Sequence, residues 1–233
     1  MTEKEYRDNI AIILREMGRR EKEGKVKRFR ELNRMARKGQ IVFAGSSLME
    51  QFPVYEMLMD RELPYTIYNR GVGGFTTREL MENLSPCILD LEPGALFLNI
   101  GTNDMNGEDF VLSEFTGRYA SILDRILEKL PEIKLFLLAF YPSNLEAAPD
   151  PHTRAVFACR TNERIRQANE AIRELAEKYH AAYLDLNGPL TDAEGNLKKE
   201  LTVDGVHMHA EGYDLVMAQL LPVLESLRQG RAQ

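Results

Sequence analysis

The sequence predicts an α/β protein: a five-stranded parallel sheet with helices on both faces, preceded by an N-terminal helical arm. Short apolar runs with the length and the β-branched or aromatic content of buried strands recur along the chain. Longer amphipathic stretches separate these runs. Because strands that alternate with helices form parallel sheets, the order indicates a three-layer α/β/α sandwich.

The chain begins with a basic arm, residues 1–39. The first 40 residues carry 13 Lys and Arg against 7 Asp and Glu, a net charge of +6, and the remainder carries 17 against 29, a net charge of −12. Interspersed charges of both signs are typical of a solvated helix face, so we expect the arm to dock on its own acidic body. The alternatives are binding to anionic lipid or nucleic acid, or covering a neighbouring subunit.

Apolar side chains in the arm recur at helical spacing. One set runs from Ile10 to Met17, and a less regular set includes Val26 and Phe29. Glycine is a poor helix former, so we expect Gly18 and Gly24 to loosen or break the helix between the two sets.

After the arm the elements follow in order. The apolar runs predict strands at 41–44, 66–68, 95–100, 135–140 and 182–186, and the amphipathic stretches predict helices at 48–59, 77–91, 110–130, 154–180 and 210–228. The run LFLLAF at 135–140 is the longest apolar segment and suits a strand that is buried on both faces. We therefore expect one α/β domain over residues 40–233.

Composition narrows the class of protein without indicating its chemistry. Two cysteines, Cys87 and Cys159, are too few for a disulfide framework and indicate reduced thiols. The first ten residues carry charges where a signal peptide is apolar, so we expect a soluble, cytoplasmic protein. No apolar run approaches the roughly 18 residues of a membrane helix, and the net charge of −6 disfavours nucleic acid as a partner.

Polar or glycine-rich segments follow the first three predicted strands, where open parallel sheets bind ligands. Gly45-Ser46-Ser47 ends the first strand, and a serine there either caps a helix or presents its hydroxyl to a cleft. The segment lacks the second glycine of the G-x-S-x-G elbow. Gly71-Val72-Gly73-Gly74 exposes backbone N–H groups to a phosphate or an oxyanion, and no lysine follows it as in a P-loop. In Gly101-Thr102-Asn103-Asp104, Asn103 is a candidate amide donor, although turns also favour Asn and Asp.

The fourth segment is Asp204-Gly205-Val206-His207, which precedes the last predicted helix. An aspartate three residues before a histidine can hydrogen-bond the imidazole, fix its tautomer and stabilise its charged form. His209 adds an alternative in which Asp204, His207 and His209 are metal ligands, although no further ligand is recognisable nearby.

The four segments, in this order, resemble the blocks of the SGNH-hydrolase superfamily, also called GDSL-type esterases and lipases. Gly45-Ser46-Ser47 is similar to the Gly-Asp-Ser block, Gly74 to the glycine of the second block, 101–104 to Gly-x-Asn-Asp, and 204–207 to Asp-x-x-His. The resemblance covers residues 41 to about 228 and implies a flavodoxin-like fold. Ser46 departs from the pattern, because the family usually has aspartate there.

The resemblance implies acyl transfer by a serine. Ser47 would be the nucleophile, His207 the general base and then acid, and Asp204 the residue that orients His207. The Ser47 and Gly74 N–H groups and the Asn103 side chain would form the oxyanion hole. No cofactor or metal is implied, and an unperturbed histidine titrates near ~6.5, so activity should rise from acid to neutral pH. Ser46 is a rival nucleophile.

The implied substrate is a small or short-chain ester, an acyl or acetyl ester of a small molecule. Residues 105–112 and 141–153 follow strands at the same edge and are expected to form the walls of the pocket, the second as a partial lid. Two other functions stay open: a non-catalytic ligand-binding domain that retains the fold, and a metallohydrolase that uses His207 and His209. A homo-oligomer is also compatible with the sequence.

Overall fold

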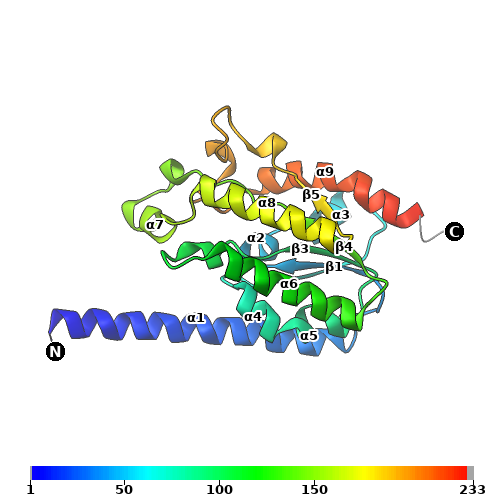
Figure 1. Cartoon of the computed structure of the whole chain (residues 1–233), viewed down its shortest axis with the longest axis horizontal. Coiled ribbons are helices and arrows are strands. Elements are labelled where there is room, and N and C mark those ends of the chain that lie inside the picture. Colours follow the sequence, from blue (N-terminus) through cyan, green and yellow to red (C-terminus); the bar gives the residue numbers. More distant parts are fainter. Residues whose placement is uncertain (1, 230–233) are drawn as a thin grey trace.

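The computed structural model describes residues 2–229 and contains the predicted parallel sheet (Figure 1). Its strand order is β2-β1-β3-β4-β5, and every neighbouring pair is parallel. The strands are β1 (Ile41–Gly45), β2 (Ile67–Gly71), β3 (Ala95–Asn99), β4 (Lys134–Leu138) and β5 (Ala182–Leu184). The chain moves outward from β1 to β2 and then crosses back to β3 on the other side of β1. This reversal creates a crevice at the carboxyl ends of β1 and β3.

Helices cover both faces of the sheet, so the predicted three-layer α/β fold is confirmed. The helices are α1 (Glu3–Asn33), α2 (Ser47–Glu50), α3 (Val54–Asp60), α4 (Thr77–Glu82), α5 (Leu84–Cys87), α6 (Leu112–Lys129), α7 (Pro151–Val156), α8 (Asn162–Lys178) and α9 (Ala210–Gln229). One face packs against α1, α4, α5, α6 and α8, and the other against α2, α3 and α9.

Alternate side chains of the central strands enter the two cores. Val42 and Ala44 of β1 belong to the core beneath α6 and α8, and Ile41 and Phe43 belong to the core beneath α9. Because β1 and β3 are apolar on both faces, their sequences are continuous apolar runs rather than alternating patterns.

Three of the predicted helices are interrupted. The segment 48–59 forms α2 and α3, separated at Phe52–Pro53, because a residue that precedes proline disfavours the helical conformation. The segment 77–91 forms α4, α5 and a 3₁₀ turn at Leu89–Leu91. The segment 154–180 forms α7 and α8, and the chain between them packs against the candidate site described below.

The arm contains one continuous helix, so the predicted break at Gly18 and Gly24 is wrong. Each glycine costs about 1 kcal/mol relative to alanine within a helix. Ion pairs along the helix, such as those of Arg19 with Glu16 and Glu23, act against that cost. Anchoring of the carboxyl half of α1 on the body provides the larger compensation, since tertiary packing stabilises most protein helices.

The carboxyl half of α1 docks on its own chain, as expected of the arm. Val26 is buried in the core, and Asn33 is buried where its side chain accepts hydrogen bonds from Arg70 Nε and Nη2 at 3.1 and 2.9 Å. The amino half extends beyond the rest of the chain (Figure 1). Its apolar set is therefore exposed, with 62% of both Leu14 and Met17 accessible, and it covers nothing within residues 2–229.

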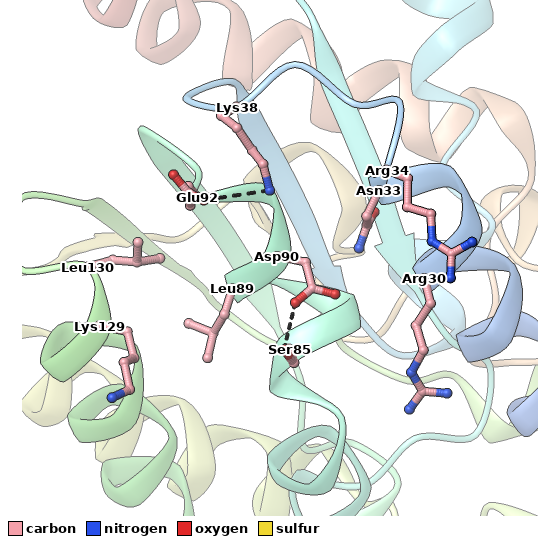
Figure 2. Close-up of a pocket in the computed structure, with 10 residues that line it drawn as sticks. All are labelled: Arg30, Asn33, Arg34, Lys38, Ser85, Leu89, Asp90, Glu92, Lys129 and Leu130. Atoms are coloured by element: carbon pink, nitrogen blue, oxygen red, sulfur yellow. Dashed lines mark hydrogen bonds and ion pairs between the residues drawn. The ribbon is translucent and has the colours of Figure 1, made fainter.

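A broad hollow of about 860 Å³ lies where α1 meets α5 and the 3₁₀ turn (Figure 2). Its charged lining is partly paired, with Lys38 Nζ 3.6 Å from Glu92 and the Ser85 hydroxyl donating to Asp90 at 2.6 Å. None of the residues that the sequence marks as catalytic candidates lines this hollow. Within the described residues, no helix combines the length and the apolarity needed to cross a membrane.

Candidate active site

Ser47 is the first residue of α2, directly after the end of β1. The turn depends on Gly45, because a Cβ there would lie 2.1 Å from the Asn99 carbonyl oxygen of β3. Ser46 is the N-cap, but its hydroxyl caps nothing: the residue is fully buried, and its Oγ has no hydrogen-bond partner among the residues that the structure describes. Ser47 is half-buried, and of the two serines its hydroxyl is the one that faces His207.

The loop before α9 brings His207 to Ser47 from 160 positions along the chain. Ser47 Oγ lies 2.8 Å from His207 Nε2, and His207 Nδ1 lies 2.6 Å from Asp204 Oδ2. The other oxygen of Asp204 accepts the N–H groups of Val206 and His207 at 3.0 and 2.8 Å. Since an ionised carboxylate only accepts hydrogen bonds, Nδ1 carries the proton, and Nε2 of a neutral His207 is the acceptor for the serine hydroxyl.

The tight turn in this loop requires Gly205. Its φ is +92°, and a Cβ there would lie 2.5 Å from the carbonyl oxygen of Asn144. Gly205 and Asn144 are also joined by a backbone hydrogen bond, in which the Asn144 N–H donates at 2.7 Å. The segment 141–153, expected as a lid, therefore supports the histidine loop at this point.

Hydrogen bonds keep Asp204 ionised. Burial alone would raise the pKa of the carboxyl group, but the ring and the backbone N–H of His207, its charge, and the N–H of Val206 outweigh burial and lower the pKa to about 2. Asp204 is consequently a carboxylate throughout the ordinary working range of an enzyme.

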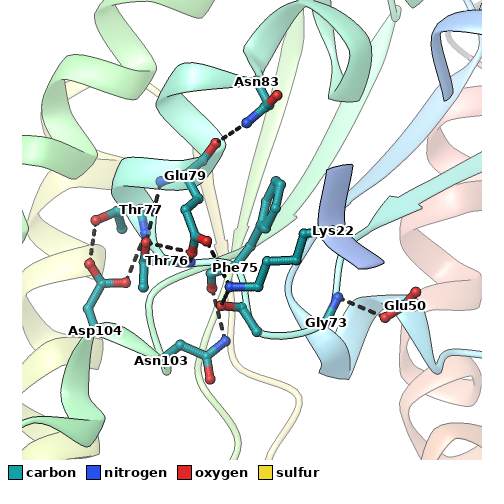
Figure 3. A network of polar contacts seen from close by, with 11 residues as sticks. Lys22, Glu50, Gly73, Phe75, Thr76, Thr77, Glu79, Asn83, Asn103 and Asp104 are labelled. Carbon is teal, nitrogen blue, oxygen red and sulfur yellow. Dashed lines mark hydrogen bonds and ion pairs between the residues drawn. The ribbon is translucent and has the colours of Figure 1, made fainter. Parts of the chain in front are cut away.

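Ser47, Gly74 and Asn103 supply three candidate N–H donors. Among the described residues, nothing accepts from the backbone N–H of Ser47 or from that of Gly74. The Asn103 amide nitrogen donates one of its two hydrogens to the Phe75 carbonyl at 2.9 Å (Figure 3). Its second hydrogen has no acceptor among the described residues. Gly74 has a φ of +74°, which a residue with a side chain rarely adopts. The four segments of the sequence thus converge at the carboxyl edge of the sheet.

Arg160 is a residue of this site that sequence reasoning missed. It is 2% exposed, its Nη2 donates to Asn103 Oδ1 at 2.9 Å, and its Nε donates to Asn106 at 2.9 Å. Burial lowers its pKa to about 10, against the opposing effect of Asp204. By donating to the amide oxygen, Arg160 fixes the orientation of Asn103 and directs the amide nitrogen toward the Phe75 carbonyl. No pattern in the sequence links Arg160 to Asn103, because the contact is purely tertiary.

Asp104, the last residue of its segment, has a structural position. Its carboxylate accepts the backbone N–H of Thr77 at 2.9 Å and the Thr77 hydroxyl (Figure 3). It also pairs with Arg118. These contacts join the start of α4 to α6 and thereby hold the glycine-rich loop next to Asn103.

Two further residues lie near His207: Phe157 in space and His209 along the chain. Phe157, between α7 and α8, packs edge-on against the His207 ring and carries the Arg160 guanidinium on its face. His209 is exposed at the start of α9. Over the described part of the chain, His, Cys, Asp and Glu side chains form no group of three or more that could hold a metal ion.

Comparisons with known proteins agree with this arrangement. Residues 43–215 match the GDSL-like lipase/acylhydrolase family. A solved structure from Streptococcus pneumonia, described provisionally as a platelet activating factor, is 30% identical with a TM-score of 0.83 and covers 93% of this chain and 99% of its own. A GDSL-like lipase from Bacteroides thetaiotaomicron is 22% identical with a TM-score of 0.71, covering 87% and 98%. The human platelet-activating factor acetylhydrolase IB subunit alpha1 is 25% identical over 79% of this chain and 75% of its own.

The lowered pKa of Asp204 predicts how stability changes with pH. Because the folded-state pKa, about 2, lies below that of the unfolded chain, about 3.9, the ionised carboxylate stabilises the fold above that range and loses its effect as the pH falls through it. The difference in unfolding free energy between the wild type and Asp204→Asn should therefore shrink from about pH 5 to about pH 2.

Urea unfolding at a series of pH values measures this difference. Asp60→Asn, which changes an exposed carboxylate of α3, corrects for the general effect of acid. A difference for Asp204→Asn that stays constant over the window would show that the hydrogen bonds to Asp204 do not depress its pKa.

Proposed function

We propose that this chain, which belongs to the GDSL-like lipase/acylhydrolase family, is a serine-dependent hydrolase of small or short-chain carboxylic esters. Membership of this family makes the chain a hydrolase of the lipase/acylhydrolase class. The observation that carries the more specific proposal is the unbroken series of hydrogen bonds from Ser47 through His207 to Asp204. A serine hydroxyl is a weak nucleophile, and this series supplies the base that it needs.

In the proposed reaction, Ser47 Oγ attacks the ester carbonyl carbon while His207 Nε2 takes the hydroxyl proton. The carbonyl oxygen becomes an oxyanion and accepts hydrogen bonds from the N–H groups of Ser47 and Gly74 and from the amide of Asn103. The tetrahedral species collapses as the C–O bond to the alcohol breaks, and His207 gives its proton to that alcohol. Water, deprotonated by His207, then attacks the acyl-enzyme, and the acid leaves as Ser47 regains its proton.

The carboxylate of Asp204 stabilises the imidazolium that forms in both steps. With a pKa of about 2, Asp204 stays ionised and does not take the proton itself. Its hydrogen bond to Nδ1 also prevents the ring from turning Nε2 away from Ser47. The half-buried position of the pair strengthens this electrostatic effect relative to water.

The first prediction for this mechanism concerns the two serines. A fluorophosphonate probe, which forms a covalent adduct with an activated serine, should label the wild type and fail to label Ser47→Ala. Ser46→Ala should keep both labelling and turnover. It should also leave the unfolding free energy unchanged or raise it by up to about 1 kcal/mol, because it removes a buried hydroxyl that has no partner.

Labelling is measured by intact-protein mass spectrometry, with circular dichroism to confirm that each variant is folded. Labelling that disappears in Ser46→Ala and persists in Ser47→Ala would reverse the assignment of the nucleophile. A folded wild type that is not labelled at all would favour a non-catalytic ligand-binding domain.

The second prediction concerns the oxyanion. Asn103→Ala should lower kcat by about 10²–10³ and change KM little, because its amide would stabilise charge that exists only in the transition state. Asn106→Ala is the matched control: Asn106 also accepts from Arg160 but is not a proposed oxyanion donor. Steady-state kinetics with p-nitrophenyl acetate measure kcat and KM for both variants. A raised KM with an unchanged kcat would instead make Asn103 a residue that binds the ground state.

The third prediction concerns the acyl group. The human relative is named an acetylhydrolase, so we propose a small acyl group, with acetyl first. A panel of p-nitrophenyl esters from acetyl to palmitoyl, together with acetylated sugars, should give the highest kcat/KM at the short end. A maximum at palmitoyl would contradict the proposed chain length and leave the serine mechanism in place.

A further inference from the structure

One lysine of the arm contacts the loop that presents Gly74, and a second contacts the glutamate that holds this loop. Lys22 and Lys25 lie one helical turn apart on α1. Lys22 reaches residues 72–76, the loop between β2 and α4 (Figure 3), and Lys25 reaches Glu50 of α2. Lys22 Nζ donates to the Gly74 carbonyl at 2.8 Å and to Glu79 Oε1 at 2.7 Å. Lys25 Nζ lies 2.8 Å from Glu50 Oε1, and the other oxygen of Glu50 accepts the Gly73 N–H at 2.7 Å.

These contacts anchor the loop on both sides of one peptide group. Glu50, paired with Lys25, holds the Gly73 N–H and thereby the peptide before Gly73. Lys22 holds the Gly74 carbonyl and thereby the peptide after Gly74. The peptide between them carries the Gly74 N–H, which has no acceptor among the described residues. This N–H is the proposed oxyanion donor, so its direction depends on the two anchored neighbours.

One backbone hydrogen bond within the loop, in which the Phe75 N–H donates to the Val72 carbonyl at 3.1 Å, closes a turn around Gly73 and Gly74. Glycine has the largest backbone freedom of any residue, and Gly73 and Gly74 are adjacent. A side chain is not tolerated without rearrangement: a Cβ at Gly73 would lie 2.7 Å from Glu50 Oε2, and one at Gly74 would lie 3.0 Å from Lys22 Cε. Further restraint comes from outside the loop: Lys22 of α1 holds the Gly74 carbonyl, Glu50 of α2 holds the Gly73 N–H, and Asn103 donates to the Phe75 carbonyl.

Docking of the helix does not account for these lysines. Val26 and the hydrogen-bonded pair Asn33 and Arg70 bury the carboxyl half of α1 without them. Lys22 and Glu79 retain 26% and 32% exposure of their side chains, and ion pairs of that kind contribute about 0–1 kcal/mol to stability. An effect of Lys22 on turnover would therefore exceed what its effect on folding could explain.

We propose that Lys22 and Lys25 are positioning residues for the oxyanion hole, so that the N-terminal helix forms part of the catalytic apparatus. This inference rests on the proposed function. Lys22 does not touch the substrate in this account; it acts through the Gly74 peptide. The preorganised direction of a donor, rather than its presence alone, determines how well it stabilises the transition state.

The test compares Lys22→Met, Lys22→Arg and Lys25→Met in the full chain with p-nitrophenyl acetate. Lys22→Met should lower kcat by about 10-fold or more with KM within about 2-fold, since misplacing a transition-state donor lowers the rate without weakening ground-state binding. Lys22→Arg keeps a cationic donor at this position and should recover most of the loss. Lys25→Met should act in the same direction.

Arg19→Met is the matched control. Arg19 lies one turn before Lys22 and pairs only with glutamates of its own helix in the structure, Glu16 and Glu23. It should keep the wild-type kcat. Hydrogen exchange at the Gly73 and Gly74 amides supplies a readout that does not need turnover: exchange should be faster in Lys22→Met than in the wild type and unchanged in Arg19→Met.

The two proposals fail in different ways. A wild type with no Ser47-dependent turnover would overturn the proposed function, whatever the lysine variants do. An active wild type with an unchanged kcat and unchanged exchange in Lys22→Met would overturn the positioning role alone. A rise in KM without a fall in kcat would overturn it as well, because it would place Lys22 in ground-state binding.

Discussion

The close packing of backbone against backbone at the carboxyl ends of β1 and β2 is the constraint on which the site depends. Gly45 approaches the Asn99 carbonyl of β3 so closely that a Cβ would lie 2.1 Å from it, and a Cβ at Gly71 would lie 2.2 Å from the Glu50 nitrogen of α2. With no side chains between them, α2 starts directly above the sheet. This places Ser47 beside the loop after β2 and the segment after β3.

The groups around Ser47 are held by parts of the chain that have no chemistry of their own. Asn103 is oriented by Arg160, which comes from the connection between α7 and α8. Asp204 lies in a loop whose turn packs on the backbone of Asn144. Asp104, within the segment that carries Asn103, secures the start of α4. Preorganisation is therefore distributed over several elements, which fits a site that must hold donors in place before charge develops.

Most of the sheet was predictable from the sequence, because strands that are buried on both faces leave continuous apolar runs. The helix boundaries were less predictable from the sequence. Pro53 divides one predicted helix, which a local rule explains. The break expected at Gly18 and Gly24 is absent, because tertiary anchoring through Asn33 and Arg70 overrides a propensity of about 1 kcal/mol per glycine.

The candidate residues Ser47, Asn103, Asp204 and His207 could be named from the sequence, because four short segments occur in the order of the blocks of the family that the chain resembles. The distances between these residues could not be predicted from the sequence, and neither could the burial of Ser46 or the contact of Arg160 with Asn103. Local sequence determines which side chains follow a strand and which turns glycine permits. Only the tertiary structure decides which of those side chains meet, because contacts such as Ser47 with His207 join residues 160 positions apart, and packing rather than local preference brings them within hydrogen-bond distance.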